Sequence, residues 1–293
     1  DVPANFQTRT SCLMFISHSI DLILIGIFGM LVGSFLNVVI YRLPKMLEKQ
    51  WAAECASLSG KELPTAEPFN LMVPRSRCPQ CNHQIRWYEN IPVISFLLLR
   101  GRCSSCGASI GWRYPLIELA CGLAFAGCAW RWGLTPSTAV WCGFCATVLA
   151  LAAIDWDTTL LPDDLTLPLV WGGLCSAALS WSGTALPDAL WGAVAGYLSL
   201  WLVYWSFKLA TGKEGMGYGD FKLYAALGAW FGWQALIHII LMASIIGAII
   251  GIGMKLSSGL REGGYVPFGP FLALAGLTAL VVTPTEMMNW IGL

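Results

Sequence analysis

Two aspartates that flank strongly apolar segments are the residues of this chain best suited to chemistry. Asp155 closes the apolar run 149–154, and Asp220 follows a glycine-rich stretch, 215–219, at the start of another apolar segment. A carboxyl group at membrane depth is costly, so it usually serves a function. Two carboxyls that share one proton can activate a water molecule for attack on a peptide carbonyl and protonate the departing amine. The pair therefore predicts an aspartyl protease that works at the bilayer.

Neighbouring acids allow other interpretations. Asp157 follows Asp155 by two residues, so on a helix it points about 160° away and competes for the same role. Asp163 and Asp164 precede an apolar run, where acids usually cap a helix, and we expect that role for them. Glu118 lies within a further apolar segment. It is either paired structurally or faces the site, and the sequence does not distinguish the two.

The surroundings of Asp220 suggest how the pair could divide its work. Gly215, Gly217 and Gly219 either permit a tight loop or let an extended substrate backbone approach the acid, and we favour the second. Asp220 should lie at a helix N-terminus, where the macrodipole favours an anion, and Asp155 at a helix C-terminus, where it favours the protonated acid. This arrangement predicts that Asp220 acts as the base, with a simple helix cap as the alternative.

Four of the eleven cysteines form two tight pairs that predict a metal site. Cys78 with Cys81 and Cys103 with Cys106 are two Cys-x-x-Cys pairs roughly twenty residues apart, which suits a tetrahedral zinc ion. Four thiolates leave no position for water, so we expect a structural zinc. A disulfide or redox pair is the alternative, and a reducing cytosol would disfavour it. His83 could substitute as a ligand, but we expect a bystander.

Composition identifies the environment of the chain. The sequence is 56% hydrophobic and 12% charged with a mean hydropathy of +0.64, whereas a soluble domain is about a quarter charged. This predicts an all-α polytopic membrane protein. A membrane-crossing helix needs about 20 apolar residues. We expect about eight such helices, near 19–40, 114–132, 137–154, 165–182, 187–207, 220–233, 235–254 and 266–283.

The basic residues predict the orientation of these helices. Ten of the seventeen Lys and Arg residues lie in 41–113, so the positive-inside rule places this segment in the cytosol and the N-terminus in the periplasm. Eight spans then bring both aspartates to the cytosolic face. The net charge is zero and no basic stripe stands out, which argues against a nucleic-acid partner. The same threading places five further basic residues in the cytosol, namely Lys208, Lys213, Lys222, Lys255 and Arg261.

We expect four regions along the chain. They are an N-terminal tail (1–18), a first transmembrane helix (19–40), a cytosolic zinc-binding insert (41–113) and a transmembrane aspartyl protease bundle (114–293). Within the insert, the stretch 46–72 begins with a mildly helical pattern and offers no further structural assignment. Glycines four residues apart let membrane helices approach closely. Such pairs occur at Gly29 and Gly33, Gly192 and Gly196, and Gly247 and Gly251.

Taken together, several short motifs resemble the bacterial type IV prepilin peptidases, the bifunctional leader peptidase/N-methyltransferases of the inner membrane. The resemblance covers about residues 26–283. No single motif is specific, but their combination and order are. The motifs are 33–44, the two cysteine pairs, 90–95, 100–103, 113–118, 154–157 with 161–163, 217–220 and 267–271.

The resemblance implies a Gly-x-Gly-Asp aspartyl protease with Asp155 and Asp220 as its pair. It implies cleavage of the basic leader of prepilins and pseudopilins after a glycine, at the cytosolic face of the inner membrane. It also implies N-methylation of the new N-terminal residue, with S-adenosylmethionine as the methyl donor. No Rossmann-type glycine fingerprint for this donor stands out, so its binding residues stay unassigned.

Two functions of other classes compete with this interpretation. A proton- or ion-coupled transporter could use the same two aspartates, but it would place them near the bilayer midplane at broken helices. Here both acids are expected near one membrane face. A non-catalytic scaffold that docks partners through the zinc insert would tolerate the substitution Asp220→Ala, whereas a protease would not.

Overall fold

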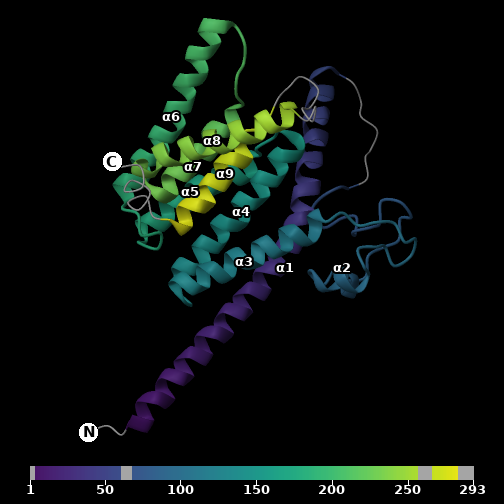
Figure 1. The fold of residues 1–293 in the computed structure, drawn as a ribbon. Helices are drawn as coiled ribbons and strands as arrows, with labels where there is room; N and C mark the ends of the chain where they lie inside the picture. Colours follow the sequence, from purple (N-terminus) through teal and green to yellow (C-terminus); the bar gives the residue numbers. More distant parts are fainter. Residues whose placement is uncertain (1–3, 61–67, 257–265, 283–293) are drawn as a thin grey trace. The chain divides into compact units, whose positions relative to one another are not determined.

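The computed structural model describes residues 4–60, 68–256 and 266–282 and shows a helical protein (Figure 1). The described residues contain no β-strand, only two isolated bridges. The all-α class expected from the sequence is therefore confirmed. The chain divides into two compact units, residues 1–146 and 147–293, which we describe separately. Arg9 has no described side chain, and Lys61 and Arg261 lie outside the described residues.

The first unit is built on α1 (Ala4–Leu58) and α3 (Arg113–Trp132), which pack side by side. Gly29 and Gly33 of α1 face α3 so closely that a Cβ at either position would lie 2.7 Å from its nearest neighbour, the Phe125 Cβ or the Glu118 Cα. The small-residue contact that the glycine spacing predicts is thus confirmed for this pair.

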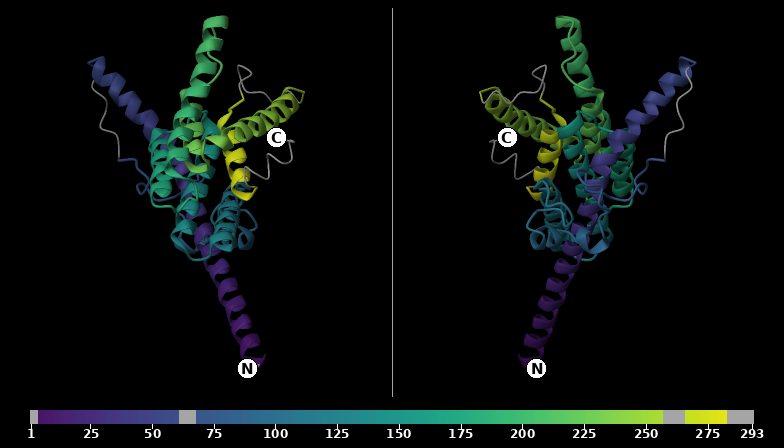
Figure 2. Two further views of the ribbon diagram at one scale, coloured as in Figure 1. Left: turned by 90° about the vertical axis from the view of Figure 1, so that its left-hand side faces the viewer. Right: turned by 90° about the vertical axis from the view of Figure 1, so that its right-hand side faces the viewer.

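Helix α1 is longer than the sequence suggests. It is one continuous helix from Ala4 to Leu58 and passes through the boundaries that we expected after residues 18 and 40 (Figure 2). Its polar C-terminal part contacts the chain that returns after residue 67. The buried Arg42 donates hydrogen bonds to the backbone oxygens of Asn70 (2.9 Å) and Pro74 (2.5 Å). The start of the expected insert is therefore a continuation of the first helix.

The remainder of the insert contains the short elements η1 (Trp87–Asn90) and α2 (Ile94–Leu98). Val93 precedes α2 with φ of 59°, which is uncommon for a β-branched residue, and its N–H donates to the Glu118 carboxylate at 2.8 Å. Glu118 is buried in α3. Of the two roles considered for Glu118, the structure therefore shows structural pairing.

The described part of the second unit contains five further helices, and α7 lies at its centre. Helix α4 (Pro136–Thr158) runs across the boundary between the units. Helix α7 packs against each of the other four helices, and nearly all of its residues from Asp220 onward are buried (Figure 1). The five helices are α5 (Asp163–Ala178), α6 (Leu186–Thr211), α7 (Tyr218–Phe231), α8 (Trp233–Leu256) and α9 (Gly269–Val281).

Backbone contact between α6 and α7 places α7 in this position. A Cβ at Gly192 would overlap the carbonyl of Gly228, and a Cβ at Gly196 would lie 2.7 Å from the Tyr224 oxygen. The second glycine pair expected from the sequence is thus also confirmed. Gly247 of the third pair comes within 3.0 Å of the Phe271 ring when a Cβ is added.

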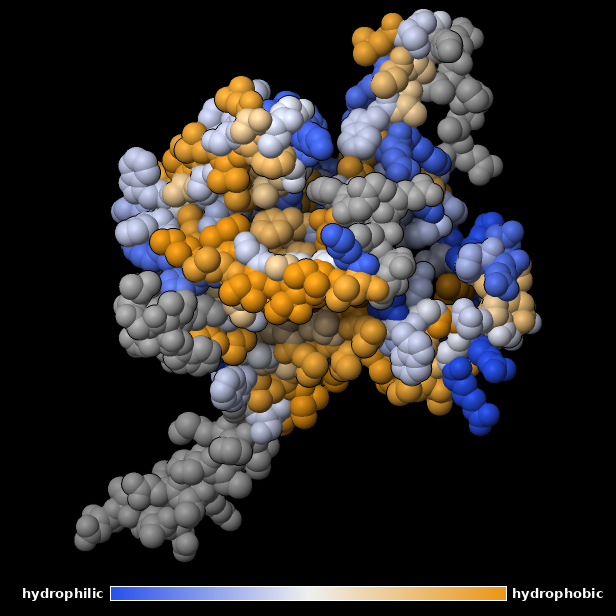
Figure 3. All heavy atoms as spheres, turned by 45° about the horizontal axis from the view of Figure 1, so that its top comes forward, coloured by the Kyte–Doolittle hydropathy of each residue, from blue (hydrophilic) through white to orange (hydrophobic). Residues whose placement is uncertain are grey.

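Among the described residues, four helical segments are long and apolar enough to cross a membrane: Ser19–Leu58 within α1, and α4, α6 and α8. Their outward faces are apolar, and Figure 3 shows hydrophobic residues spread over one face of the molecule. Such surfaces suit lipid rather than water. The protein is therefore a membrane protein. The eight expected segments coincide with α1 and α3–α9 to within a few residues at most ends, but the number of crossings stays a prediction.

Candidate functional site

Asp155 lies in the last turn of α4 and is buried, with 4% of its surface exposed. Its backbone carbonyl accepts a hydrogen bond from the Thr159 N–H as the helix ends. Asp157, two residues further on, is exposed. The structure therefore favours Asp155 over Asp157 as the acid that can work in an environment shielded from water.

Asp220 is the third residue of α7 and is equally buried. Its carboxylate accepts a hydrogen bond from the backbone N–H of Gly217, the N-cap residue, as acidic groups in a capping box do. The carboxylate also lies within electrostatic reach of Asp155. Asp220 thus lies in the first turn of its own helix and, at the same time, within electrostatic range of the second acid. The two interpretations considered for it are compatible.

The glycines before Asp220 do not owe their presence to a left-handed turn. Gly215, Gly217 and Gly219 all lack a positive φ. A Cβ at Gly219 would come within 2.7 Å of the Leu161 Cβ, so this position needs glycine for space. The approach of a substrate backbone to these glycines stays a prediction.

An ion pair connects the start of α5 to α7. Lys222 Nζ lies 2.6 Å and 2.7 Å from the two carboxylate oxygens of Asp163. Asp163 and Asp164 occupy the first turn of α5, where the helix dipole favours acids, but the N-cap residue is Pro162. The expected capping by these acids is therefore replaced by an ion pair for Asp163.

An aromatic cluster that the sequence did not reveal supports the start of α7. The ring centroids of Tyr204 and Tyr218 are 5.2 Å apart, and Phe221 contacts both rings. Tyr197 joins from one helical heptad before Tyr204, with its ring 6.0 Å from Phe221. The i, i+7 spacing of two tyrosines on α6 was the available signal. The cluster fixes the end of α7 that carries Asp220.

The four predicted cysteine ligands come together in the first unit. The sulfurs of Cys78, Cys81, Cys103 and Cys106 all lie within 4.8 Å of one another. The Cys78 and Cys106 sulfurs are 3.8 Å apart, and those of Cys81 and Cys103 are 4.0 Å apart. A tetrahedral zinc ion with Zn–S bonds of about 2.3 Å requires sulfurs about 3.8 Å apart. The residues therefore fit a four-coordinate metal ion.

The ionisation of these thiols also favours the binding of a cation between them. Backbone N–H groups of Cys81 and then Gln80 lower the pKa of the Cys78 thiol to about 6. The Ala108 N–H acts in the same direction on Cys106, but the neighbouring thiols, with Cys81 first, and burial raise the pKa of Cys106 to about 11. Because like charges at this separation repel, the four groups cannot all be thiolates without a positive ion between them.

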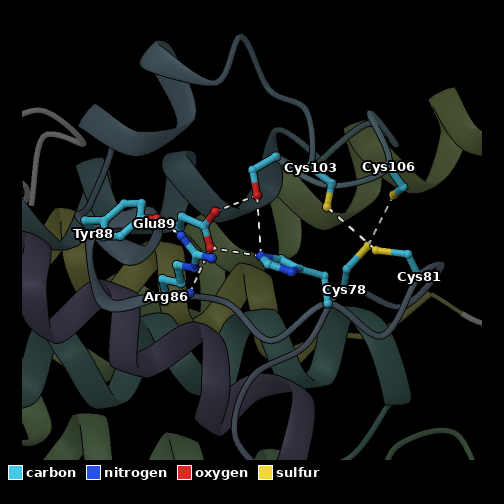
Figure 4. Close-up of polar contacts among 9 residues, drawn as sticks. Cys78, Cys81, Arg86, Tyr88, Glu89, Cys103 and Cys106 are labelled. Carbon is cyan, nitrogen blue, oxygen red and sulfur yellow. Dashed lines mark hydrogen bonds and ion pairs between the residues drawn. The ribbon is translucent and has the colours of Figure 1, made fainter.

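A polar network behind the cysteines connects the two pairs (Figure 4). Glu89 accepts hydrogen bonds from the Arg86 N–H at 2.8 Å and the Ser104 hydroxyl at 2.5 Å, and its carboxylate lies 3.4 Å from His83. The Arg86 N–H and then Ser104 lower the pKa of Glu89. His83 follows the first pair and Ser104 lies within the second, so Glu89 connects the two loops. His83 is outside the four-sulfur group, as expected of a bystander.

Comparison with known proteins places these features in a family. Residues 27–132 match the model of the bacterial peptidase A24 N-terminal domain, and residues 142–252 match that of the type IV leader peptidase family. The first range contains the cysteine cluster, and the second contains both aspartates. No solved structure matches the chain.

Curated relatives agree with these matches over most of their length. A prepilin leader peptidase/N-methyltransferase of Stutzerimonas stutzeri is 54% identical over 87% of this chain and 88% of that protein. One from Pseudomonas aeruginosa is 52% identical over 90% of this chain and 92% of that protein, and one from Aeromonas hydrophila is 51% identical over 88% and 89%. The chain belongs to the prepilin leader peptidase/N-methyltransferase family.

Proposed function

We propose that the protein is an aspartyl endopeptidase of the bacterial inner membrane that removes the basic leader of type IV prepilins and pseudopilins. It cuts after a glycine at the cytosolic face and then methylates the new N-terminal amine. The observation that carries the peptidase proposal is that two buried carboxyls, Asp155 and Asp220, come from two separate helices and lie within electrostatic range of each other. The names of the relatives support the substrate and the second activity.

The chemistry follows from two acids that share one proton. The ionised carboxyl removes a proton from water, whose oxygen attacks the peptide carbonyl. The protonated carboxyl stabilises the developing oxyanion, and the C–N bond then breaks as the amine takes up a proton. Two like charges held together cannot both ionise, so the burial of the pair favours the singly protonated state.

The other groups in the proposal have structural roles or stay unassigned. Zinc held by Cys78, Cys81, Cys103 and Cys106 would order the insert and, with four sulfur ligands, would leave no open position for substrate. S-adenosylmethionine would supply the methyl group for the amine. No described residue is assigned to this donor.

Substitution of the two acids tests the peptidase proposal. Purified protein in detergent should lose about 10³-fold or more of its cleavage of a prepilin peptide on Asp155→Asn or Asp220→Asn, as expected for groups that transfer protons in the reaction. Asp157→Asn is the matched control, because this acid is on the same helix but exposed.

Thermal unfolding and zinc content should match those of the unaltered protein in all three variants. Retained cleavage by both Asp155→Asn and Asp220→Asn would remove the peptidase proposal. In that case, proton uptake into proteoliposomes that requires both acids would point to the transporter alternative.

A further inference from the structure

The motif 267–271 contains a glycine whose role the proposed function leaves open. Gly269 is the first residue of α9 and is buried. Its φ is not positive, so the backbone conformation does not require glycine. A Cβ built there would lie 2.6 Å from the Oδ2 atom of Asp155 and 3.1 Å from its Cγ atom. Real Cβ atoms essentially never approach other atoms below 3.0 Å, so a side chain at this position would have to displace the carboxyl group.

We infer that Gly269 is a positioning residue for Asp155. This inference rests on the proposed function, in which Asp155 is one of the two reacting acids. Without a side chain at 269, the carboxyl group can lie directly against the first turn of α9. A methyl group there would displace the carboxyl group. This displacement would change the geometry of the acid pair.

Leu161 packs against the glycine that borders each of the two acids. Its side chain would contact a Cβ at Gly269 at 3.2 Å and a Cβ at Gly219 at 2.7 Å. Gly219 directly precedes Asp220, so one leucine packs between the two glycines that border the two acids. The separation of the carboxyls therefore depends on two backbone positions that carry no side chain.

The contact also changes what the helix ends contribute to the pair. Asp220 lies in the first turn of α7, and Asp155 lies at the C-terminal end of α4 but touches the first residue of α9. Both carboxyls therefore lie beside a helix N-terminus, where the macrodipole favours an anion. The α9 dipole therefore opposes the α4 dipole, which alone would favour a protonated Asp155. The helix dipoles then do not decide which of the two acids acts as the base.

Catalysis by Gly269→Ala tests the inference in the full-length protein. A displacement of the order of 1 Å in a catalytic group can cost about 100-fold in rate, and we expect such a loss in kcat with KM changed less than about threefold. The pH profile of kcat/KM should also change, because its two apparent pKa values report the coupling of the pair.

Gly276→Ala is the control for overpacking. It lies on the same helix, and its added methyl would meet the Leu227 Cδ2 atom at 2.5 Å, away from both acids. This variant should lower the thermal midpoint without changing the pH profile. An unchanged kcat and profile in Gly269→Ala would overturn the inference.

A stability cycle tests the contact without using activity. Gly269→Ala should lower the thermal midpoint in the unaltered protein but not in an Asp155→Ala background, which has no carboxyl to displace and should fold even if the single variant does not. An equal loss in both backgrounds would place the clash elsewhere and refute the positioning role. If both Asp155→Asn and Asp220→Asn retain cleavage, the proposed function fails, while the cycle still decides whether Gly269 accommodates Asp155.

Discussion

At the scale of single residues, Asp220 combines two roles that a substitution must separate. Its carboxylate accepts the Gly217 N–H at the start of α7 and lies within electrostatic range of Asp155. Asp220→Ala removes both contacts and should lose about 1 kcal/mol of stability, as other cap deletions do. Asp220→Asn keeps an acceptor for the N–H but cannot carry the negative charge. Loss of cleavage in the asparagine variant is therefore the informative result.

The acidity of Cys78 leads to a pH prediction for the metal centre. The pKa of this thiol is depressed from 9.0 to about 6, so its thiolate is favoured over that range and is lost as the pH falls through about 6. Because protons compete with a metal ion for the sulfurs, a metal held by the four cysteines should be retained at high pH and released as the pH falls. Transfer of zinc to a coloured chelator at each pH measures this. Metal retention that does not change with pH would contradict the prediction, and Cys55→Ser, an exposed cysteine outside the cluster, is the control.

At the scale of elements, the position of α7 depends on backbone contact with α6. The contact at Gly192 leaves no room for even a methyl group, since the nearest atom is the backbone carbonyl of Gly228 rather than a flexible side chain. Because α7 also carries Asp220, a change in this contact should affect both stability and the acid pair.

Gly192→Ala tests this contact. Overpacking of this kind costs about 3 kcal/mol, so the thermal midpoint in detergent should fall clearly and cleavage should fall with it. Gly127→Ala in α3 is the matched control, because an added Cβ there would meet no described heavy atom within 4 Å outside its own helix. Alanine gains up to about 1 kcal/mol over glycine in a helix, so the control should be unaffected or slightly more stable. Equal midpoints for the two variants would contradict the packing described here.

The sequence predicted the elements better than the contacts between them. Apolar runs and glycine spacing are local signals, and they located α3–α9 and the close approaches at Gly33 and Gly196. The extension of α1 to Leu58 was missed because that part is polar and is supported by distant residues, such as Lys49 stacked 4.3 Å from the Phe69 ring. The contact of Gly269 with Asp155 joins positions far apart in the chain, and no local pattern encodes it.

At the scale of the whole molecule, the two candidate centres belong to different units. The cysteine cluster lies within residues 1–146, whereas both aspartates lie within residues 147–293. Each unit has its own internal packing, through α1 with α3 in the first and around α7 in the second. Loss of the metal should therefore disturb one unit more than the other.

Hydrogen exchange after zinc removal checks this separation. If a metal ion orders the cysteine cluster, chelation should speed amide exchange in residues 76–110, while residues 218–231 of α7 keep their protection. Mock-treated protein is the reference, and restored zinc should reverse the change. Faster exchange in α7 as well would show that the units are energetically coupled.

The buried Arg42 divides the insert into two parts: a base, residues 68–75, that is bonded to α1, and a tip, residues 76–110, that carries the four cysteines. Its guanidinium holds the backbone oxygens of Asn70 and Pro74 through contacts that do not involve the cysteines. Protein without the metal would thus keep the base in place, and only the tip would lose its ordered structure. The four thiols would then search for a returning ion within a short tethered loop, and shorter loops close at a lower entropic cost. A metal ion removed from the cluster would then rebind without refolding of the membrane helices.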